Sequence, residues 1–469
     1  MSEKIIINPL TRISGFAEIE ATVENRHVSE AKTKGFMFRG FEKMLLGRAP
    51  FDAVYFTQRI CGICSTAHSM ASTLALEDAL NIKPSEQGRY LRDILHCCEF
   101  LQNHIRHFYQ YTIPDFAEIP QVSTVYCKDP GDYRLPGKIN EQIAQNYFTS
   151  IDYSRKAHEM LAVLGGKAPH NHGVFIGGIT TQPTTDKIIK IKSILSQIKE
   201  FIENSMIPDV YSISEYYPDY FNLGSGYGSF LSYGCFNGYA HMGTLYLEPS
   251  VYDNGKTEKL VEHNITENID YSWYDTGPDT YKPLEAVPED NQNKDKAYSW
   301  VKAPRYLGIP FETGPLARMW LSGEYRRGIS ALDRTIARVL EARKITEIMG
   351  VLLAHVVPNV PVQQEYHIPD SAVGRGLIDT VRGSLGHWLK IDNGVLSFYQ
   401  IITPTAWNFS TRDKRFRGVT EQALIGTAIK DISNPVEIGR IVRSFDPCIS
   451  CATHVYYPGQ EKRNFQVLS

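Results

Sequence analysis

The sequence lacks an excess of positive charge and any long apolar run, and each absence excludes a class of protein. The 469 residues include 49 lysines and arginines against 52 aspartates and glutamates, which gives a net charge of −3. Proteins that bind nucleic acid need a clustered basic excess, so we expect no nucleic-acid partner. No stretch approaches the roughly 18 apolar residues of a membrane helix, so we expect no direct membrane span.

A secretory signal is also missing from the start of the chain. The apolar part of the first residues, Ile5–Ile7, is shorter than the apolar region of about 7 to 15 residues in a signal peptide. We therefore expect any export to depend on the signal of a partner subunit. The compartment stays open between the cytoplasm and a membrane-associated or exported location reached through that partner.

Cysteine is scarce, and the eight residues in the chain do not make a disulfide scaffold. Four of them form two Cys-x-x-Cys pairs near opposite ends of the chain, Cys61 with Cys64 and Cys448 with Cys451. Thiolates are soft ligands, which suit nickel, iron or zinc better than magnesium or calcium. The spacing alone leaves three interpretations open: a structural zinc site, a redox dithiol, or pairs of buried small residues.

The size of the chain weighs against structural zinc, because such sites usually stabilise small domains that lack a core. A site shared by both pairs would bring the two ends of the chain together in one interior. We therefore predict a single domain over residues 1–454, although the length alone would allow about three domains. Residues 208–300 are rich in Tyr, Gly, Asn and Asp and are predicted to form a strand- and loop-rich insertion.

Periodic apolar residues predict four long helices, and alternating residues over 16–36 predict a β-hairpin. Ser85 is the expected cap of the first helix, which should end near Pro114. Long helices must pack on one another to bury their apolar faces. We therefore predict a helix-rich α+β fold, a core bundle of long helices with peripheral β-hairpins and short sheets. The other three helices are expected over residues 140–166, from about 185 to 201, and over 323–351.

The residues around each cysteine pair are the most informative feature of the sequence. The two segments are Arg59-Ile60-Cys61-Gly62-Ile63-Cys64-Ser65-Thr66-Ala67-His68 and Asp446-Pro447-Cys448-Ile449-Ser450-Cys451-Ala452-Thr453-His454. They resemble the two signature motifs of the large subunit of nickel–iron hydrogenases, Arg-x-Cys-Gly-x-Cys-x-x-x-His and Asp-Pro-Cys-x-x-Cys-x-x-His. Five further segments resemble other blocks of that family in the same order: residues 8–13, 38–42, 302–306, 314–318 and 403–408.

The resemblance implies an oxidoreductase that reversibly cleaves H2 into protons and electrons. It implies that Cys61 and Cys448 are terminal nickel ligands, and that Cys64 and Cys451 bridge nickel to an iron that carries one carbon monoxide and two cyanides. Cys448 is also implied as the thiolate through which the proton leaves. Thiolates suit this reaction because they hold the metal and can themselves accept a proton.

Four further side chains are implied as part of that centre. Arg382 and Thr405 resemble the family's donors to the cyanides, which are anionic and need hydrogen-bond donors in a dry pocket. Asp446 is expected to pair with Arg382 or Arg59, and His68 to donate to a bridging sulfur. Taken alone, these residues would be interpreted as a surface or ion-pair arginine, a turn hydroxyl, a turn aspartate and a core histidine.

Glu42 and His454 match the ligands of a magnesium ion that lies apart from the active site in relatives. Carboxylate oxygen suits magnesium, and histidine is tolerated as a minority nitrogen ligand. The backbone carbonyl that completes the magnesium site is expected near Ile401. Taken alone, Glu42 would be a solvated glutamate on a helix face.

Two positions depart from the family pattern. Ser14 stands where relatives usually carry a glutamate that relays protons from the terminal thiolate, and Asn103 stands where many carry an aspartate above the metals. Neither side chain titrates near neutral pH. We hypothesise that Ser14 supports a slower relay through its hydroxyl, with Glu18 or Glu20 as candidate substitutes.

The resemblance also implies partner proteins. With four cysteines assigned to the centre, no set remains for an iron–sulfur relay. Electrons are therefore expected to pass to a small subunit that holds iron–sulfur clusters, in a heterodimer at least. In relatives a maturation endopeptidase cuts after the histidine that matches His454, so residues 455–469 are expected to be a C-terminal extension removed on maturation.

Two other functions stay open at this stage. A hydrogen-sensing regulator would use the same site, and the changes at Ser14 and Asn103 fit it, whereas the C-terminal extension fits a matured enzyme better. The other alternative is a non-catalytic protein, either a structural zinc protein or a relative of the quinone-site subunit of respiratory complex I. Those complex I relatives lack the four cysteines, which counts against the second form.

Overall fold

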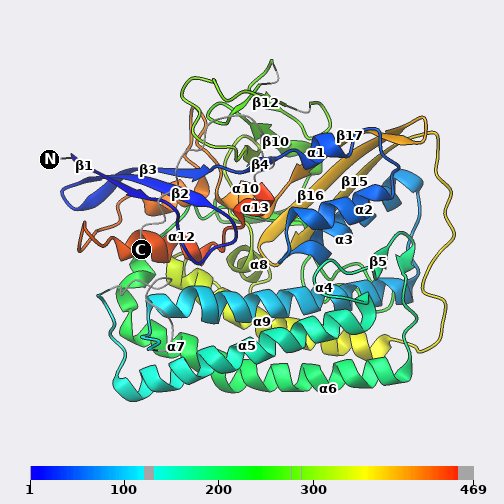
Figure 1. Ribbon diagram of the computed structural model, residues 1–469, viewed down its shortest axis with the longest axis horizontal. Helices are drawn as coiled ribbons and strands as arrows, with labels where there is room; N and C mark the ends of the chain where they lie inside the picture. Colours follow the sequence, from blue (N-terminus) through cyan, green and yellow to red (C-terminus); the bar gives the residue numbers. More distant parts are fainter. Residues whose placement is uncertain (1, 121–130, 276, 287, 453–469) are drawn as a thin grey trace.

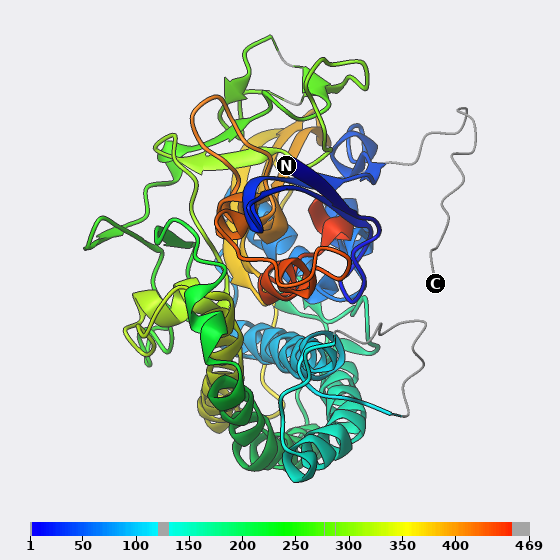
Figure 2. The same ribbon diagram turned by 90° about the vertical axis from the view of Figure 1, so that its left-hand side faces the viewer.

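The computed structural model describes residues 2–120, 131–275, 277–286 and 288–452. Figure 1 shows a layer of long helices along the lower side of the molecule, with the sheets and shorter helices above it. In the turned view of Figure 2 the same helices form a group below the N-terminal strands. This mixture of long helices and small sheets confirms the predicted α+β fold class.

Four long helices form the lower layer. Helix α4 packs against both α5 and α9, and α6 packs against the same two helices. The apolar face that the periodicity of α6 indicates is buried, as Ile191 and Ile198 show. All four predicted helices are therefore confirmed, with differences at their ends. They are α4 (Glu86–Arg106), α5 (Gly137–Gly165), α6 (Thr185–Phe201) and α9 (Ala331–His355).

Capping residues decide where two of these helices begin. The hydroxyl of Ser85 accepts a hydrogen bond of 3.0 Å from a backbone N–H in the first turn of α4, as predicted. Helix α9 begins after Ser330 and not near Gly323, so the predicted start of the fourth helix is wrong. Ser330 and Asp333 form a reciprocal capping box there, and it satisfies the backbone N–H groups that a helix start leaves free.

Two of the four three-stranded antiparallel sheets among the described residues contain the longest strands. One has the order β1-β2-β3 and contains the predicted hairpin, which is confirmed. The other has the order β15-β16-β17 and was not predicted, because β16 is buried on both faces and shows no alternation of polar and apolar residues. The strands are β1 (Ser2–Ile7), β2 (Ala17–Glu24), β3 (His27–Gly35), β15 (Ser371–Thr380), β16 (Gly383–Asp392) and β17 (Val395–Ile402).

The remaining elements are short, apart from the 16-residue helix α3. Among them are the strands of the segment predicted to be strand- and loop-rich, into which helix α7 extends as far as Tyr216. The strands are β4 (Phe38–Arg39), β5 (Val174–Phe175), β6 (Gly178–Ile179), β7 (Phe230–Ser232), β8 (Ser250–Asp253), β9 (Lys256–Lys259), β10 (Ile265–Asn268), β11 (Tyr274–Asp275), β12 (Thr280–Tyr281), β13 (Glu289–Asp290) and β14 (Ala303–Tyr306). The helices are α1 (Phe41–Met44), α2 (Asp52–Thr57), α3 (Ser65–Leu80), α7 (Ile207–Tyr216), α8 (Pro315–Leu321), α10 (Pro404–Asn408), α11 (Val419–Leu424), α12 (Val436–Ser444) and α13 (Ile449–Ala452).

Helix α3 lies directly on strand β15, and two glycines of the strand make this approach possible. A Cβ atom on Gly376 would lie 2.0 Å from the carbonyl oxygen of Ala71, and one on Gly374 would lie 1.9 Å from that of Ala75. Glycine therefore lets the strand backbone touch the helix backbone. Because α3 begins directly after the first cysteine pair and β15 leads to Arg382, this contact sets the distance between them.

The two ends of the chain meet beside this contact. Ser14 and Cys448 form a short parallel bridge, in which the Ser14 N–H donates to Pro447 O (3.4 Å) and the Ile449 N–H donates to Ser14 O (2.7 Å). Apolar residues of the first sheet pack there against those of α12, including Ile438. The backbone that carries the second cysteine pair is therefore held by the N-terminal segment.

Replacing Gly376 with alanine is expected to lower the stability of the protein by about 1 to 3 kcal/mol, because the added methyl group overpacks the α3–β15 contact. Gly350→Ala is the matched control: Gly350 lies within α9, and an added Cβ meets no atom within 4 Å. That change should leave stability unchanged or raise it slightly, because alanine favours the helix. Thermal unfolding of both variants by calorimetry checks this, and equal unfolding temperatures would contradict it.

Candidate metal centre

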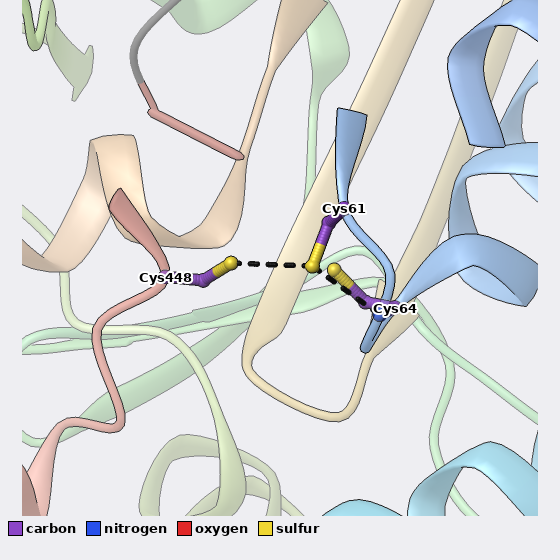
Figure 3. Close-up of side chains that lie close together, drawn as sticks. All are labelled: Cys61, Cys64 and Cys448. Carbon is purple, nitrogen blue, oxygen red and sulfur yellow. Dashed lines mark hydrogen bonds between the residues drawn. The ribbon is translucent and has the colours of Figure 1, made fainter. Parts of the chain in front are cut away.

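Three buried cysteines from the two pairs come together in one cluster. The Sγ atoms of Cys61, Cys64 and Cys448 all lie within 4.8 Å of one another, and those of Cys61 and Cys448 are 3.3 Å apart. Cys61 and Cys64 lie on the turn that leads into α3, and Cys448 faces them from the segment before α13 (Figure 3). The structure therefore brings the two ends of the chain to one site, as the shared-site interpretation requires.

The structure does not describe the side chains of two predicted ligands, Cys451 and His454. Cys451 belongs to α13, three positions after Cys448, but its side chain is outside the part of the chain that the structure describes. His454 lies beyond the described residues altogether. At Cys61 the backbone N–H groups of Ile63 and Cys64 approach Sγ at 3.3 and 3.4 Å.

Arg382 lies over the cluster in a fixed orientation. Its Nε donates to the carbonyl oxygen of Asp446 (2.9 Å), and its Nη2 donates to Asn103 Oδ1 (3.0 Å) and lies 3.1 Å from Asp446 Oδ1. The Asn103 amide in turn donates to Asp446 Oδ2 (2.8 Å). Of the two partners expected for Asp446, the structure therefore brings together Arg382. The remaining nitrogen, Nη1 of Arg382, is buried and has no hydrogen-bond acceptor among the described residues.

Two buried guanidinium groups lie on this side of the sulfurs, each close to a carboxylate. Burial lowers the pKa of Arg382, but Asp446 and the three nearby cysteines raise it well above its ordinary value, so the guanidinium stays charged. Arg338 is a second buried guanidinium close to Asp446, and it donates to Ser444 O (2.9 Å). Asp446 pairs with Arg382, and both Asp446 and Glu341 lie near Arg338, so carboxylates match these arginines.

A small cavity lies between the sulfurs and these donors. The Thr405 hydroxyl oxygen accepts a hydrogen bond from the Cys448 N–H (3.0 Å), which leaves the hydroxyl hydrogen free to donate. Burial lowers the pKa of His68 to about 3, so its ring is neutral. The cavity is lined by Cys64, Ala67, His68, Thr380, Arg382, Leu385, Pro404, Thr405 and Cys448.

The chemistry of these groups fits a thiolate-bound transition-metal centre with anionic ligands. Clustered sulfurs suit nickel and iron. The buried Arg382 Nη1 and the Thr405 hydroxyl supply donors for anionic ligands on the opposite wall of the cavity. Each of the sequence-predicted centre residues that the structure describes with its side chain therefore lies at this one cavity or contacts a residue that does.

Comparisons with known proteins agree with this geometry. Residues 39–129, 122–327 and 321–454 match the family described as nickel-dependent hydrogenase. This chain belongs to that family. It is 36% identical to the periplasmic [NiFeSe] hydrogenase large subunit of Desulfomicrobium baculatum, over 97% of this chain and 95% of that one. It is 29% identical to the hydrogenase-2 large chain of Escherichia coli K12, over 97% and 98% of the two chains.

The structural comparison gives the same family. The Ni-Fe-Se hydrogenase of D. vulgaris Hildenborough in its reduced state superposes with a TM-score of 0.93 and 34% identity, covering 97% of this chain and 100% of that chain. The chain is therefore a hydrogenase large subunit, an enzyme that cleaves H2. This hydrogenase subunit has cysteine at all four candidate ligand positions.

Glu42 lies in a second polar site of this hydrogenase subunit. It is 7% exposed, which contradicts the alternative of a solvated glutamate. Its Oε1 accepts hydrogen bonds from the Ile401 N–H (3.1 Å) and from Lys302 Nζ (3.4 Å), and Lys302 also binds Glu267 (3.0 Å). Glu42 therefore lies against the strand where the carbonyl ligand of magnesium is expected.

Two residues that hold the cysteine pairs in place were not identified as functional from the sequence. Arg39 donates to the carbonyl oxygens of Ile60 and Ser450, and so joins the two pairs through their backbones. Glu99 on α4 accepts hydrogen bonds from the Thr66 and Ala67 N–H groups (2.7 and 3.0 Å) at the start of α3. Arg39 lies in a family-like segment that could have drawn attention to it, whereas Glu99 has no such signal.

An ion-pair cluster also fixes the approach to the second pair. Asp115 accepts hydrogen bonds from Arg443 at 2.6 and 2.7 Å and from Arg12 at 2.5 Å. Burial raises the pKa of Asp115, but the two arginines outweigh burial and hold that pKa at about 2. Arg12 belongs to the N-terminal segment and Arg443 to α12, so Asp115 ties both to the short 3-10 helix Ile113–Asp115 that follows α4.

Asp115→Asn is expected to lower the stability of the protein by about 3 kcal/mol, because it leaves two buried guanidinium groups without their counter-charge. Since the folded-state pKa is lowered, this stabilisation is present above the ordinary pKa of 3.8 and is lost as the pH falls towards 2. Unfolding at pH 7 measures the effect. Asp152→Asn, at an exposed ion pair with Arg155, is the control and should change stability by less than about 1 kcal/mol. Equal losses would contradict the role of the cluster.

Proposed function

We propose that this subunit catalyses reversible heterolytic cleavage of H2 at a nickel–iron centre held by Cys61, Cys64, Cys448 and Cys451. In this proposal the iron carries one carbon monoxide and two cyanides. The observation that carries the proposal is the gathering of three buried sulfurs, within 4.8 Å of one another, beneath the buried guanidinium of Arg382. When bound, the nickel–iron centre supplies an electron-poor site that polarises H2 and accepts its electrons.

The protein side of the reaction begins at the sulfur of Cys448. A thiolate next to polarised H2 is a base, and Cys448 is the proposed acceptor of the proton. Its Sγ donates to the Ser14 hydroxyl oxygen across 3.4 Å. The Ser14 hydroxyl can accept that proton and release its own, as serine both donates and accepts hydrogen bonds. The first step of a proton route away from the sulfur is therefore Cys448 to Ser14.

The carboxylates named as substitutes for the missing glutamate are held elsewhere. Glu18 and Glu20 both bind Lys34, at 2.7 and 2.5 Å, on the strands β2 and β3. Burial raises the pKa of Glu20, but Lys34 and Lys4 outweigh burial and bring it to about 2, so this carboxylate is a poor proton acceptor near neutral pH. Ser14 is half-buried, and we infer that its hydroxyl passes the proton to water.

The walls of the cavity are proposed to bind the anionic ligands of iron. Arg382 Nη1 and the Thr405 hydroxyl are the donors, and the salt bridge with Asp446 keeps Arg382 charged and oriented. Removal of water from the cavity strengthens each of these contacts. Glu42 and His454 are the proposed protein ligands of magnesium, with a backbone carbonyl near Ile401.

A second subunit is needed to carry electrons away. Four of the eight cysteines are assigned to the centre, and Cys97, Cys98 and Cys235 are buried as free thiols. We therefore propose an iron–sulfur small subunit as partner in a heterodimer, and a maturation endopeptidase that removes residues 455–469 after His454. None of the described helices is long and apolar enough to span a membrane.

The alternatives explain fewer of the observations. A structural zinc site would use the cysteines but would leave the buried Arg382 Nη1 and the cavity beside it without a role. A hydrogen sensor would share the centre, and no described feature favours it over an enzyme. Membership in the hydrogenase family also supports the catalytic function.

An infrared spectrum of the purified subunit with its partner is expected to show sharp bands of metal-bound carbon monoxide and cyanide. Metal analysis should find nickel and iron in equal amounts. Cys64→Ala is the control, because loss of a bridging thiolate should abolish both metals and bands. Zinc alone, without such bands, in a fully matured preparation would contradict the proposed centre.

Ser14→Ala is expected to slow hydrogen–deuterium exchange with H2 by about 100-fold, the usual scale for losing a proton-transfer group. Ser14→Glu should speed the exchange, since a carboxylate relays protons better than a hydroxyl. Ser29→Ala on β3, whose hydroxyl donates to Thr22 O, is the control and should change nothing. Exchange and turnover that stay the same in Ser14→Glu would rule out the relay through Ser14.

A further inference from the structure

A chain of three buried side chains leads from the metal cavity into the sheet β15-β16-β17. His68 on α3 lines the cavity, and its Nδ1 lies 3.2 Å from Nε2 of His387 on β16. The Nδ1 of His387 lies 2.8 Å from the hydroxyl of Tyr399 on β17. All three side chains are at most 1% exposed. Since His68 uses Nδ1 for His387, its Nε2 is the ring nitrogen left to face the cavity.

The two hydrogen bonds of this chain permit two arrangements of the protons. In the first, Tyr399 donates to His387 Nδ1, and His387 Nε2–H donates to His68 Nδ1. The hydrogen of His68 is then on Nε2, at the cavity. In the second, both bonds run in the opposite direction, and Nε2 of His68 turns a lone pair towards the cavity.

The groups at the two ends of the chain favour the first arrangement. A phenol is a better hydrogen-bond donor than an imidazole, and burial raises the pKa of Tyr399, so the hydroxyl keeps its proton. At the other end the cavity is lined by the sulfurs of Cys64 and Cys448. A thiolate accepts hydrogen bonds, so a lone pair on His68 Nε2 would face other lone pairs. The first arrangement satisfies both ends at once.

We propose that His387 and Tyr399 are positioning residues that fix the tautomer of His68, so that its Nε2–H donates to a cysteine sulfur of the centre. This inference rests on the proposed function, because it concerns sulfurs that bind metal. A hydrogen bond to a thiolate withdraws electron density from sulfur and so from the metals. The chain from Tyr399 therefore tunes the centre from a strand that does not touch it.

The test is the infrared spectrum of the matured complex with the Tyr399→Phe change. Phenylalanine keeps the ring but removes the donor that directs His387, so the fraction of His68 with Nε2–H falls. The metals then become richer in electrons. The carbon monoxide and cyanide bands should move several wavenumbers lower, and the midpoint potential of the centre should become more negative.

Tyr109→Phe is the matched control. Tyr109 is also fully buried and loses one hydroxyl bond, to Asp209 (2.7 Å), but that bond lies among the long helices. Its spectrum should equal that of the unchanged protein. Unmoved bands in Tyr399→Phe, or an equal shift in Tyr109→Phe, would overturn the inference. Bands absent from the unchanged protein itself would instead overturn the proposed centre.

A second measurement does not depend on how well the variant matures. Neutron diffraction from crystals of the unchanged, matured complex locates the hydrogen atoms on imidazole rings. We expect hydrogen on Nε2 of both His68 and His387. Hydrogen on Nδ1 of His68 would overturn the inference even if the infrared bands behave as expected.

Discussion

The backbone contact between helix α3 and strand β15 is the constraint on which the centre depends. Gly374 and Gly376 let the strand lie against the carbonyl oxygens of the helix, closer than any side chain would permit. The helix begins at the first cysteine pair, and the strand ends at the turn that carries Arg382. A shift of either element by one side-chain width would separate the sulfurs from the guanidinium. Close packing thus sets the geometry before any metal is bound.

Ion pairs and hydrogen bonds then orient the arginine side chains around the centre. Buried ions are costly unless they are paired, and each of the buried arginines near the centre has defined acceptors. Arg382 is held by Asp446 and Asn103, while Arg39 donates to backbone carbonyls of both cysteine segments. Asn103 orients Arg382 without neutralising it, unlike an aspartate at that position. The Nη1 of Arg382, which has no acceptor among the described residues, is the donor left for the anionic centre.

The sequence predicted those parts of the fold that have a local signal. Four helices followed from apolar periodicity, the cysteine cluster from two spaced pairs, and Arg382, Thr405 and His68 from family-like motifs. The sheet β15-β16-β17 was missed because a strand buried on both faces lacks the alternating pattern.

Contacts between distant segments carry even less local signal. Glu99 bonds the first turn of α3 from another helix, and Asp115 joins the N-terminal segment to α12. The start predicted for α9 was too early, because the prediction did not take the capping box at Ser330 into account. Pairings of this kind depend on tertiary structure, so residue type and spacing alone do not reveal them.

The bridge between Ser14 and Cys448, together with Arg39 on Ser450, has a consequence for the order of synthesis. Cys448 leaves the ribosome 387 residues after Cys61. The first cysteine pair is therefore synthesised long before the segment that carries Cys448. The centre can be completed only on a chain that has left the ribosome, and premature termination yields a protein with half a binding site.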